Sequence, residues 1–133
     1  LYQGDAENLD VATGVLDVVT VAFGVRNFGN LEAGLSEIMR SLRSGGHIVV
    51  LEFSTPRNWL VRKAYQFYSN HVMKPVGGMV SKDRKAYDYL PDSIVEFPDR
   101  ERFLEIMSRT GFVECRRRSQ SLGIAQIYIG KKP

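Results

Sequence analysis

Two apolar stretches, LDVVTVA at Leu16–Ala22 and HIVVLEF at His47–Phe53, decide the fold class of this chain. Both are nearly continuous and rich in β-branched residues, which is typical of strands buried on both faces of a parallel sheet. The segment between them predicts a helix, because Asn30 is a favourable N-cap and a Gly45–Gly46 pair ends the apolar periodicity. The apolar positions of that helix are Leu31, Leu35, Ile38, Met39 and Leu42. Residues 16–53 therefore predict a strand–helix–strand unit with parallel strands and a right-handed crossover.

The rest of the chain predicts two helices and a hairpin. Asn58–Asn70 has the apolar and polar alternation of an amphipathic helix, and residues 71–98 predict short turns and loops. A departure of this length inside a compact domain is usually functional. Asp99 caps a helix that runs to Thr110 and ends at a glycine. The strands Phe112–Arg118 and Ile124–Ile129 then predict an antiparallel hairpin.

This order of elements predicts an α/β fold, the second half of a doubly wound domain. The glycine-rich turn G-x-G-x-x-G that opens the first half of such domains does not occur in the sequence. The chain opens on LYQGD at Leu1–Asp5, which is typical of the end of a strand. We therefore expect the natural protein to extend further in the N-terminal direction.

Composition narrows the class of protein. The sequence has 133 residues, of which 44% are hydrophobic and 25% charged, as in a soluble globular domain. No apolar run approaches the ~20 residues of a transmembrane helix. Cys115 is the only cysteine, so no intrachain disulfide forms and a reducing, cytoplasmic setting is expected. His47 and His71 lie far apart, and no histidine or cysteine pair has the spacing of metal ligands.

The most basic run of the sequence is Arg116–Arg118 in a chain of net charge +3. Successive side chains of a strand alternate between its faces, so these three do not form one patch. The run lacks the interleaved aromatic residues of single-strand binders. It therefore indicates a solvated edge strand and no nucleic-acid partner.

Several motifs resemble those of the class I (Rossmann-like) methyltransferases: GDAE at Gly4–Glu7, LDVV at Leu16–Val19 and RSGGH at Arg43–His47. A more specific string, FGVRN at Phe23–Asn27, with LEFS at Leu51–Ser54, resembles the ubiquinone/menaquinone C-methyltransferase family of the UbiE/MenG type. The tyrosine-rich insertion resembles that family too, and the resemblance covers essentially the whole chain.

The resemblance implies the C-terminal part of one class I methyltransferase domain over residues 1–133, with a helical substrate-lid insertion at about 57–98. It implies S-adenosyl-L-methionine as cofactor, no metal, and methylation of a ring carbon of a polyprenyl benzoquinol or naphthoquinol. Its partners are then a lipophilic quinol and a membrane contacted at its periphery. A homo-oligomer is expected for another reason, because without the first strands of the fold the strand Leu16–Ala22 has an unpaired edge. Two alternatives stay open: a class I methyltransferase for another small acceptor, and a non-catalytic remnant or assembly module, since this chain lacks the N-terminal half of the cofactor site.

The resemblance assigns the cofactor to four residues. The Asp5 carboxylate accepts from the adenine amino group, and the Ala6 amide donates to a ring nitrogen. Ala22 and Phe23, at the end of the first predicted strand, line the same pocket. The pattern alone favours Asp5 as a turn or helix-cap aspartate, and only the resemblance favours the cofactor role.

The catalytic residues implied are Arg26 and Asn27, in the loop directly after a buried strand, and His71. Tyr65 and Tyr68 are three apart on the predicted helix, so they share a face, either as a lid over the quinol or as a packing stripe. Glu52 lies in the strongest apolar strand and must be paired there. Its role is either structural or beside the methionine end of the cofactor.

Overall fold

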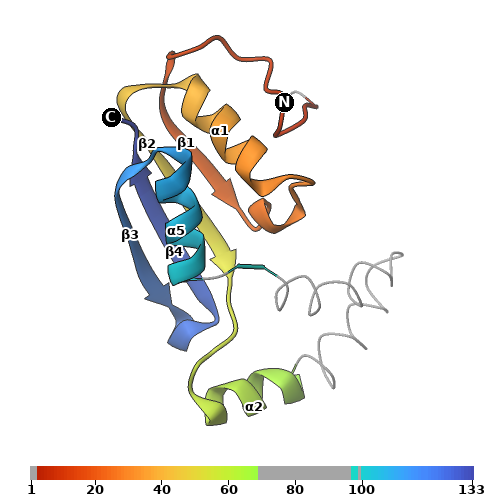
Figure 1. Cartoon of the computed structure of the whole chain (residues 1–133). Helices are drawn as coiled ribbons and strands as arrows, with labels where there is room; N and C mark the ends of the chain where they lie inside the picture. Colours follow the sequence, from red (N-terminus) through yellow and green to blue (C-terminus); the bar gives the residue numbers. More distant parts are fainter. Residues whose placement is uncertain (1–2, 69–96, 99) are drawn as a thin grey trace.

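Four strands form one mixed sheet among residues 3–68, 97–98 and 100–133, which the computed structural model describes (Figure 1). Strand β1 (Leu16–Ala22) runs parallel to β2 (Leu42–Phe53). Strand β4 (Ala125–Lys131) pairs antiparallel with β2 and with β3 (Val113–Gln120), so the order is β1-β2-β4-β3. The predicted parallel pair and terminal hairpin are confirmed.

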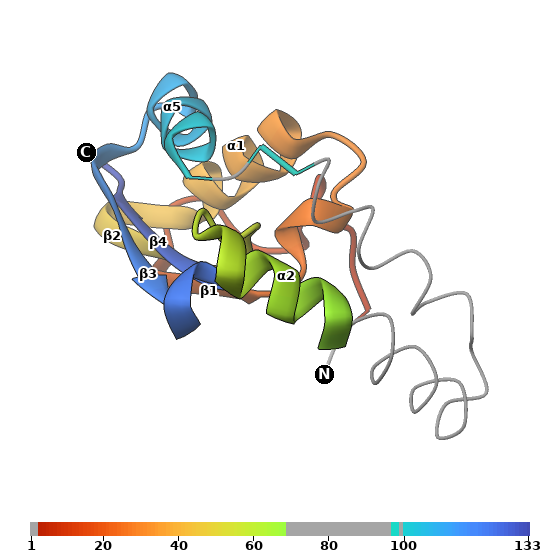
Figure 2. The same ribbon diagram turned by 90° about the horizontal axis from the view of Figure 1, so that it is seen from below.

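Two helices cover one face of this sheet (Figures 1 and 2). Helix α1 (Leu31–Ser41) connects β1 to β2, and the Asn30 side chain caps it by accepting from the Ala33 amide at 3.0 Å. Helix α5 (Glu101–Thr110) precedes β3 and ends at Gly111, which adopts the left-handed conformation, as predicted. The predicted cap of α5, Asp99, lies outside the described residues.

The core lies between α1, α5 and the covered face of the sheet. Phe103 and Met107 of α5 are fully buried, and the Phe103 ring meets the Tyr128 ring of β4 edge to face at 4.7 Å. Leu35 and Ile38 of α1 pack into the same cluster. The 3.6-residue periodicity puts the apolar side chains of each helix on one face, and the burial of that face holds the helix on the sheet.

The prediction that β1 is buried on both faces is wrong for the described residues. Val19 and Val21 pack against the core, whereas Val18 is 51% exposed and Ala22 is exposed. Strand β1 lies at an edge of the described sheet, and the described helices α1 and α5 cover only one face. The β-branched composition of β1 therefore does not correspond to burial here.

Strand β2 begins at Leu42, directly after α1, and not at the predicted His47. The extra residues form an irregularity in the pairing with β1, where Gly45 adopts a φ of +77°. The Lys132 ammonium donates to the Leu42 carbonyl at 2.7 Å and to the Arg40 carbonyl at 3.5 Å. A cation at this end of α1 satisfies carbonyls that the helix itself leaves open.

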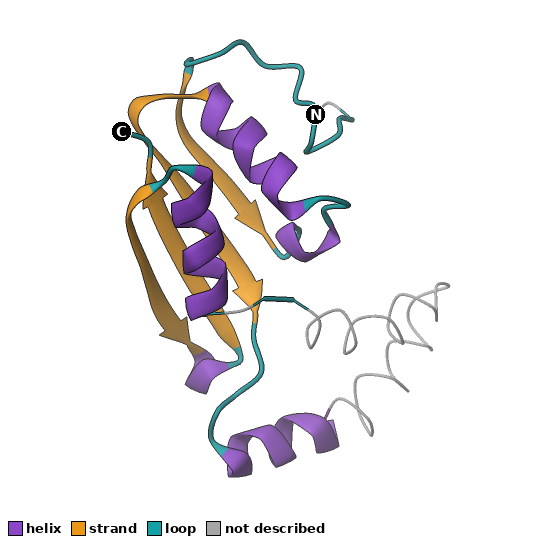
Figure 3. Ribbon diagram, in the orientation of Figure 1, coloured by secondary structure: helices purple, strands orange, loops and turns teal. Residues whose placement is uncertain are grey.

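Helix α2 (Trp59–Tyr68) follows β2 after a short loop and lies beyond the carboxyl ends of β1 and β2 (Figure 3). The Asn58 side chain caps it by accepting from the Leu60 amide at 2.9 Å. The described part of the predicted helix 58–70 is thus confirmed, and most of the predicted lid insertion at 57–98 lies outside the described residues. None of the described helices is both long enough and apolar enough to cross a membrane.

The basic run Arg116–Arg118 lies on β3, at an edge of the described sheet, as predicted. Arg116 and Arg118 are exposed, while the Arg117 side chain turns to the other face and pairs with Glu101 of α5 at 2.5 Å. The alternation of faces therefore divides this run, as expected of a strand.

Backbone of β1 and of β2 itself leaves no room for a side chain at Gly46. A Cβ atom on Gly46 would lie 2.9 Å from the Arg43 carbonyl oxygen and 3.1 Å from those of Leu16 and Asp17. We expect Gly46→Ala to lower the free energy of unfolding by about 1–3 kcal/mol, because backbone must shift. Gly4→Ala is the control, since nothing lies within 4 Å of its Cβ position. Urea denaturation that gives equal stabilities for the two variants would contradict this packing.

Candidate functional site

The loop after β1 is fixed at both of its ends. The Phe23 amide donates to the Leu51 carbonyl at 2.8 Å, which extends the β1–β2 ladder, and Phe23 itself adopts a φ of 55°. A non-glycine residue in this region is uncommon and needs support from its surroundings. A 3₁₀ turn, Val25–Asn27, follows, and Val25 is buried at 1% exposure. The loop is therefore anchored in the core on one side of Arg26.

A buried ion pair joins this loop to β2. The Arg26 guanidinium donates to the Glu52 carboxylate at 2.6 Å, and the Arg26 amide donates to the other oxygen of that carboxylate at 3.4 Å. The side chains of Arg26 and Glu52 are 10% and 0% exposed. The same guanidinium nitrogen of Arg26 also donates to the Phe23 carbonyl at 2.7 Å. The pairing that the sequence requires for Glu52 is thus made by Arg26.

One aromatic ring of a stacked pair lies beside the guanidinium. The Phe23 and Phe53 rings stack with centroids 4.3 Å apart, and the Arg26 guanidinium carbon lies 5.7 Å from the Phe53 centroid. That distance is within the range of a cation–π contact. Phe23 is 37% exposed, so an apolar surface adjoins the cation where the loop meets solvent.

Tyr65 of α2 carries a phenol within the electrostatic influence of Arg26. Burial raises the pKa of the Tyr65 hydroxyl, and the positive charge of Arg26 acts in the opposite direction and lowers that pKa. Tyr65 is half-buried, whereas Tyr68 is 51% exposed. The two tyrosines, predicted to share one face, therefore differ in burial. His71 lies outside the described residues.

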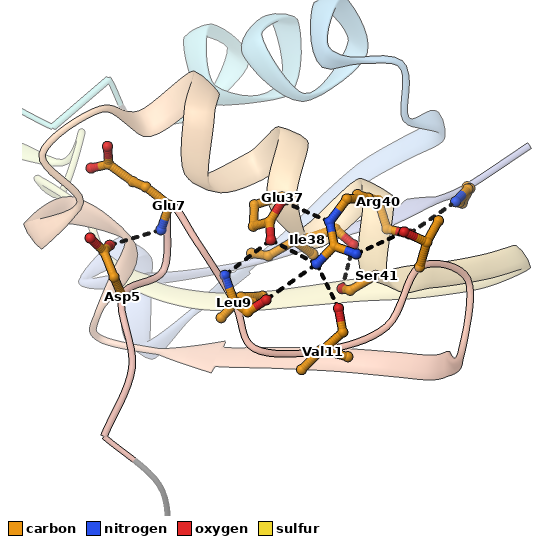
Figure 4. A network of polar contacts seen from close by, with 10 residues as sticks. Asp5, Glu7, Leu9, Val11, Glu37, Ile38, Arg40 and Ser41 are labelled. Carbon is orange, nitrogen blue, oxygen red and sulfur yellow. Dashed lines mark hydrogen bonds and ion pairs between the residues drawn. The ribbon is translucent and has the colours of Figure 1, made fainter.

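The N-terminal segment lies beside α1 (Figure 4). The exposed Asp5 carboxylate accepts from the Glu7 amide at 2.9 Å, as a turn aspartate does. The Glu7 carboxylate accepts from the Asn30 amide at 2.6 Å, which brings the segment to the start of α1. Ala6, between them, is half-buried. Gln3 and Gly4 have no regular structure, and Leu1 and Tyr2 lie outside the described residues, so the predicted strand end does not appear in the described part.

An ion pair on α1 holds the rest of this segment. The Glu37 carboxylate accepts from the Leu9 amide at 3.0 Å, and Arg40 donates to the Val11 carbonyl at 2.7 Å (Figure 4). The two side chains also pair with each other at 2.7 Å, and this hydrogen bond lowers the pKa of Glu37. These contacts of Glu37 and Arg40 with the N-terminal segment were not predicted, although opposite charges at i,i+3 spacing on a helix indicate such a pair.

The structure thus brings together some of the predicted site residues and not others. The Arg26 guanidinium contacts the Phe23 carbonyl and the Glu52 carboxylate at the carboxyl ends of β1 and β2, and its charge acts on Tyr65 of α2. Asn27 and Ala22 are exposed at the same edge, and the Asn27 amide donates to the Gly24 carbonyl at 3.0 Å. Asp5 and Ala6 belong to the separate segment beside α1. In the part of the chain that is described, no group of three His, Cys, Asp or Glu side chains is placed to hold a metal ion.

A model of the ubiE/COQ5 methyltransferase family matches residues 1–132 of the sequence. The chain belongs to this family. The family resemblance of the FGVRN and LEFS strings is therefore confirmed.

Curated relatives agree with this membership. Over 116 residues the chain is 48% identical to the ubiquinone/menaquinone biosynthesis C-methyltransferase UbiE of Geobacter sulfurreducens, covering 87% of this chain and 45% of that protein. It is 43% identical over 130 residues to the demethylmenaquinone methyltransferase of Porphyromonas gingivalis, covering 98% of this chain and 53% of that protein. The chain spans about half the length of the curated relatives it matches.

Solved structures confirm the predicted fold class. A SAM-dependent methyltransferase from Thermotoga maritima, described as a possible histamine N-methyltransferase, superposes with a TM-score of 0.65 at 18% identity, covering 98% of this chain and 62% of that one. The CurJ carbon methyltransferase superposes with a TM-score of 0.62 at 20% identity, covering 96% of this chain and 33% of that one. At these identities the likeness shows the fold alone.

The opposing influences on Tyr65 can be separated experimentally. We expect the combined Arg26→Gln and Glu52→Gln variant to raise the pKa of Tyr65 further, because burial persists while the stabilising cation is removed. The two amide side chains can still hydrogen bond, and circular dichroism checks that the variant folds. The measurement is a pH titration of ¹³C-labelled tyrosine by NMR, with Tyr65→Phe to assign the signal. Arg118→Gln is the control, since Arg118 is exposed on β3; an unchanged or lower Tyr65 pKa in the double variant would contradict the arrangement.

Proposed function

We propose that this chain carries the substrate-activating part of a methyltransferase that transfers a methyl group from S-adenosyl-L-methionine to a ring carbon of a polyprenyl benzoquinol or naphthoquinol. Family membership supports the reaction class. The observation that carries the residue assignment is the Arg26 guanidinium, which the buried Glu52 carboxylate holds at 2.6 Å at the carboxyl ends of β1 and β2. Burial raises the pKa of the Tyr65 hydroxyl on α2, and the positive charge of Arg26 opposes that rise, which is the direction of effect that a quinol hydroxyl requires.

The cofactor is assigned to the N-terminal segment beside α1 (Figure 4) and to the end of β1. The Asp5 carboxylate would accept from the adenine amino group, and the Ala6 amide would donate to a ring nitrogen. Asp5 fits this role because its carboxylate is exposed and is oriented by the Glu7 amide. Phe23 and Ala22 are exposed at the end of β1 and would line the pocket. When bound, S-adenosyl-L-methionine supplies an electrophilic methyl group.

Methylation at carbon requires electron density on the quinol ring, which comes from ionising the adjacent hydroxyl. A phenol has a pKa near ~10, so its ionisation at neutral pH costs about 4 kcal/mol. A cation beside the hydroxyl lowers such a pKa by about 1–3 units, which recovers much of that cost. Arg26 is therefore assigned as the charge that stabilises the phenolate.

Arg26 does not serve as the base. Removing a proton from a guanidinium at neutral pH would cost roughly 7 kcal/mol, and the adjacent Glu52 carboxylate holds the positive charge in place. Asn27, exposed in the same turn, would hold the quinol oxygen or a water molecule. The hydroxyl proton would pass to water or to His71.

Glu52 acts through Arg26 and is a positioning residue. Its carboxylate accepts from both the Arg26 amide and the guanidinium, so it fixes the start and the end of that side chain. Tyr65 and Tyr68 are assigned to the quinol on α2, with Tyr65 on the side of the cation. The apolar rings of Phe23 and Phe53 offer a surface for the quinol ring.

The test is methyl transfer to a demethylated prenyl-benzoquinol and prenyl-naphthoquinol by the natural protein that carries this sequence. We expect Arg26→Lys to keep part of the rate, and the uncharged Arg26→Gln/Glu52→Gln pair to lose about 10- to 1000-fold, the range that 1–3 pKa units represent. The pH of half-maximal rate should rise in the uncharged pair while cofactor affinity stays unchanged.

Three outcomes would overturn the proposal. An unchanged rate in the uncharged pair removes Arg26 from the chemistry. A defect confined to cofactor binding moves Arg26 to the cofactor site. Turnover of another small acceptor but of neither quinol assigns a different substrate. Arg109→Gln/Glu32→Gln, which neutralises an exposed ion pair between α5 and α1 without changing the net charge, is the matched control.

A further inference from the structure

Helix α2 has two apolar faces, and only one of them is turned toward the site. Val61 and Tyr65 are four residues apart and half-buried, so they form the inner face. Trp59 and Lys63, also four apart, lie on a different face together with Leu60. Trp59 is 58% exposed and Leu60 is 59% exposed. An exposed tryptophan and leucine together on a short helix mark an interaction surface.

The charged residues of α2 itself all have one sign, whereas Arg57, just before the helix, pairs with Glu101 at 3.4 Å. Arg62 and Lys63 are exposed, and the Lys63 ammonium lies 5.4 Å from the centroid of the Trp59 ring. Helix α2 contains no acidic residue. In the sequence from 53 to 82 there is no Asp or Glu, whereas the basic residues are Arg57, Arg62, Lys63, Lys74 and Lys82. The complementary surface is therefore anionic.

We propose that the outer face of α2, defined by Trp59, Leu60, Arg62 and Lys63, docks on a membrane surface that contains anionic lipids. Tryptophan is favoured at the level of the lipid headgroups, and basic side chains beside it add attraction to anionic lipids. Lys63 extends over the Trp59 ring, so the cation and the ring face the same partner. A helix of ten residues is suited to lie in the interface and does not span the bilayer.

Docking by the outer face would leave the inner face directed at the proposed site. Tyr65 on that inner face is within the electrostatic influence of Arg26. A lipophilic substrate dissolved in the bilayer would then enter beside α2. The docking itself does not depend on methyl transfer, so vesicle binding tests it separately from the proposed function.

The chain carries its own reporter for this test. Trp59 is the only tryptophan of the sequence, so its fluorescence reports on the proposed surface alone. We titrate the protein with phosphatidylcholine vesicles and with vesicles in which phosphatidylglycerol replaces part of that lipid. The expected result is a blue shift and quenching by brominated acyl chains with the anionic vesicles only. High salt should reverse binding, because the attraction is screened.

Matched double variants separate this surface from general positive charge. Arg62→Gln/Lys63→Gln should weaken vesicle binding about 25-fold, since each basic residue near an anionic surface contributes about fivefold. Arg116→Gln/Arg118→Gln removes the same charge from exposed positions of β3 and should bind as the parent does. Circular dichroism confirms that both variants fold.

Three results would overturn the docking surface. The first is the absence of a blue shift with anionic vesicles. The second is an equal loss of binding in both double variants, which would mean that net charge alone is responsible. The third is vesicle binding during which Trp59 stays accessible to an aqueous quencher, which would mean that another surface makes the contact.

Discussion

The buried ion pair between Arg26 and Glu52 is the interaction on which the proposed site depends. Neither charge is stable alone in that position, because a buried ion without its partner costs about 3–5 kcal/mol. The pair therefore requires the loop after β1 and the end of β2 to stay together. The parallel register of the two strands, with Ala22 opposite Leu51, puts the two residues within this distance. A change in register would separate the two charges and leave one of them either exposed to solvent or buried without its partner.

This constraint also explains the surroundings of the pair. Phe23 adopts its unusual φ at the point where its carbonyl accepts from Arg26, so the strained backbone and the guanidinium hold each other. Val25 secures the far side of the turn in the core. The result is a cation fixed on one side by a carboxylate and bordered on the other by aromatic rings. A preorganised charge of this kind needs no rearrangement when a phenolate forms beside it.

Much of the fold follows from periodicity in the sequence. The bounds of β1, the start of α1 at its Asn30 cap and the terminal hairpin are determined locally, by strand composition, a capping side chain and turn residues. The start of β2 is not determined locally, because the Leu42 carbonyl accepts from the ammonium of Lys132, ninety residues away in the sequence. The exposure of Val18 could not be predicted from the sequence either, because this apolar strand has the same sequence pattern whether one of its faces or both are covered.

At the site, too, some features could be predicted from the sequence and others could not. Arg26 was identified because it follows a strand within a family motif, and Glu52 was known to need a partner. The sequence could not join the two, because their separation depends on strand register. The sequence predicted an amphipathic helix at 58–70 but not which side faces the protein. In the structure Leu60 is exposed, whereas Val61 and Tyr65 are half-buried and form the inner face. Which side of an amphipathic helix faces the protein is decided by tertiary contacts that periodicity does not contain.

The central claim is that Arg26, held by Glu52, stabilises a phenolate. The most direct measurement is the pKa of a chromophoric phenol bound to the natural protein that carries this sequence, followed by absorbance as pH is varied. The account predicts that the bound phenol has a lower pKa than the free phenol, by about 1–3 units, and that Arg26→Gln/Glu52→Gln removes this difference. A bound phenol whose pKa is unchanged or raised, or is lowered equally in that double variant, would contradict the account.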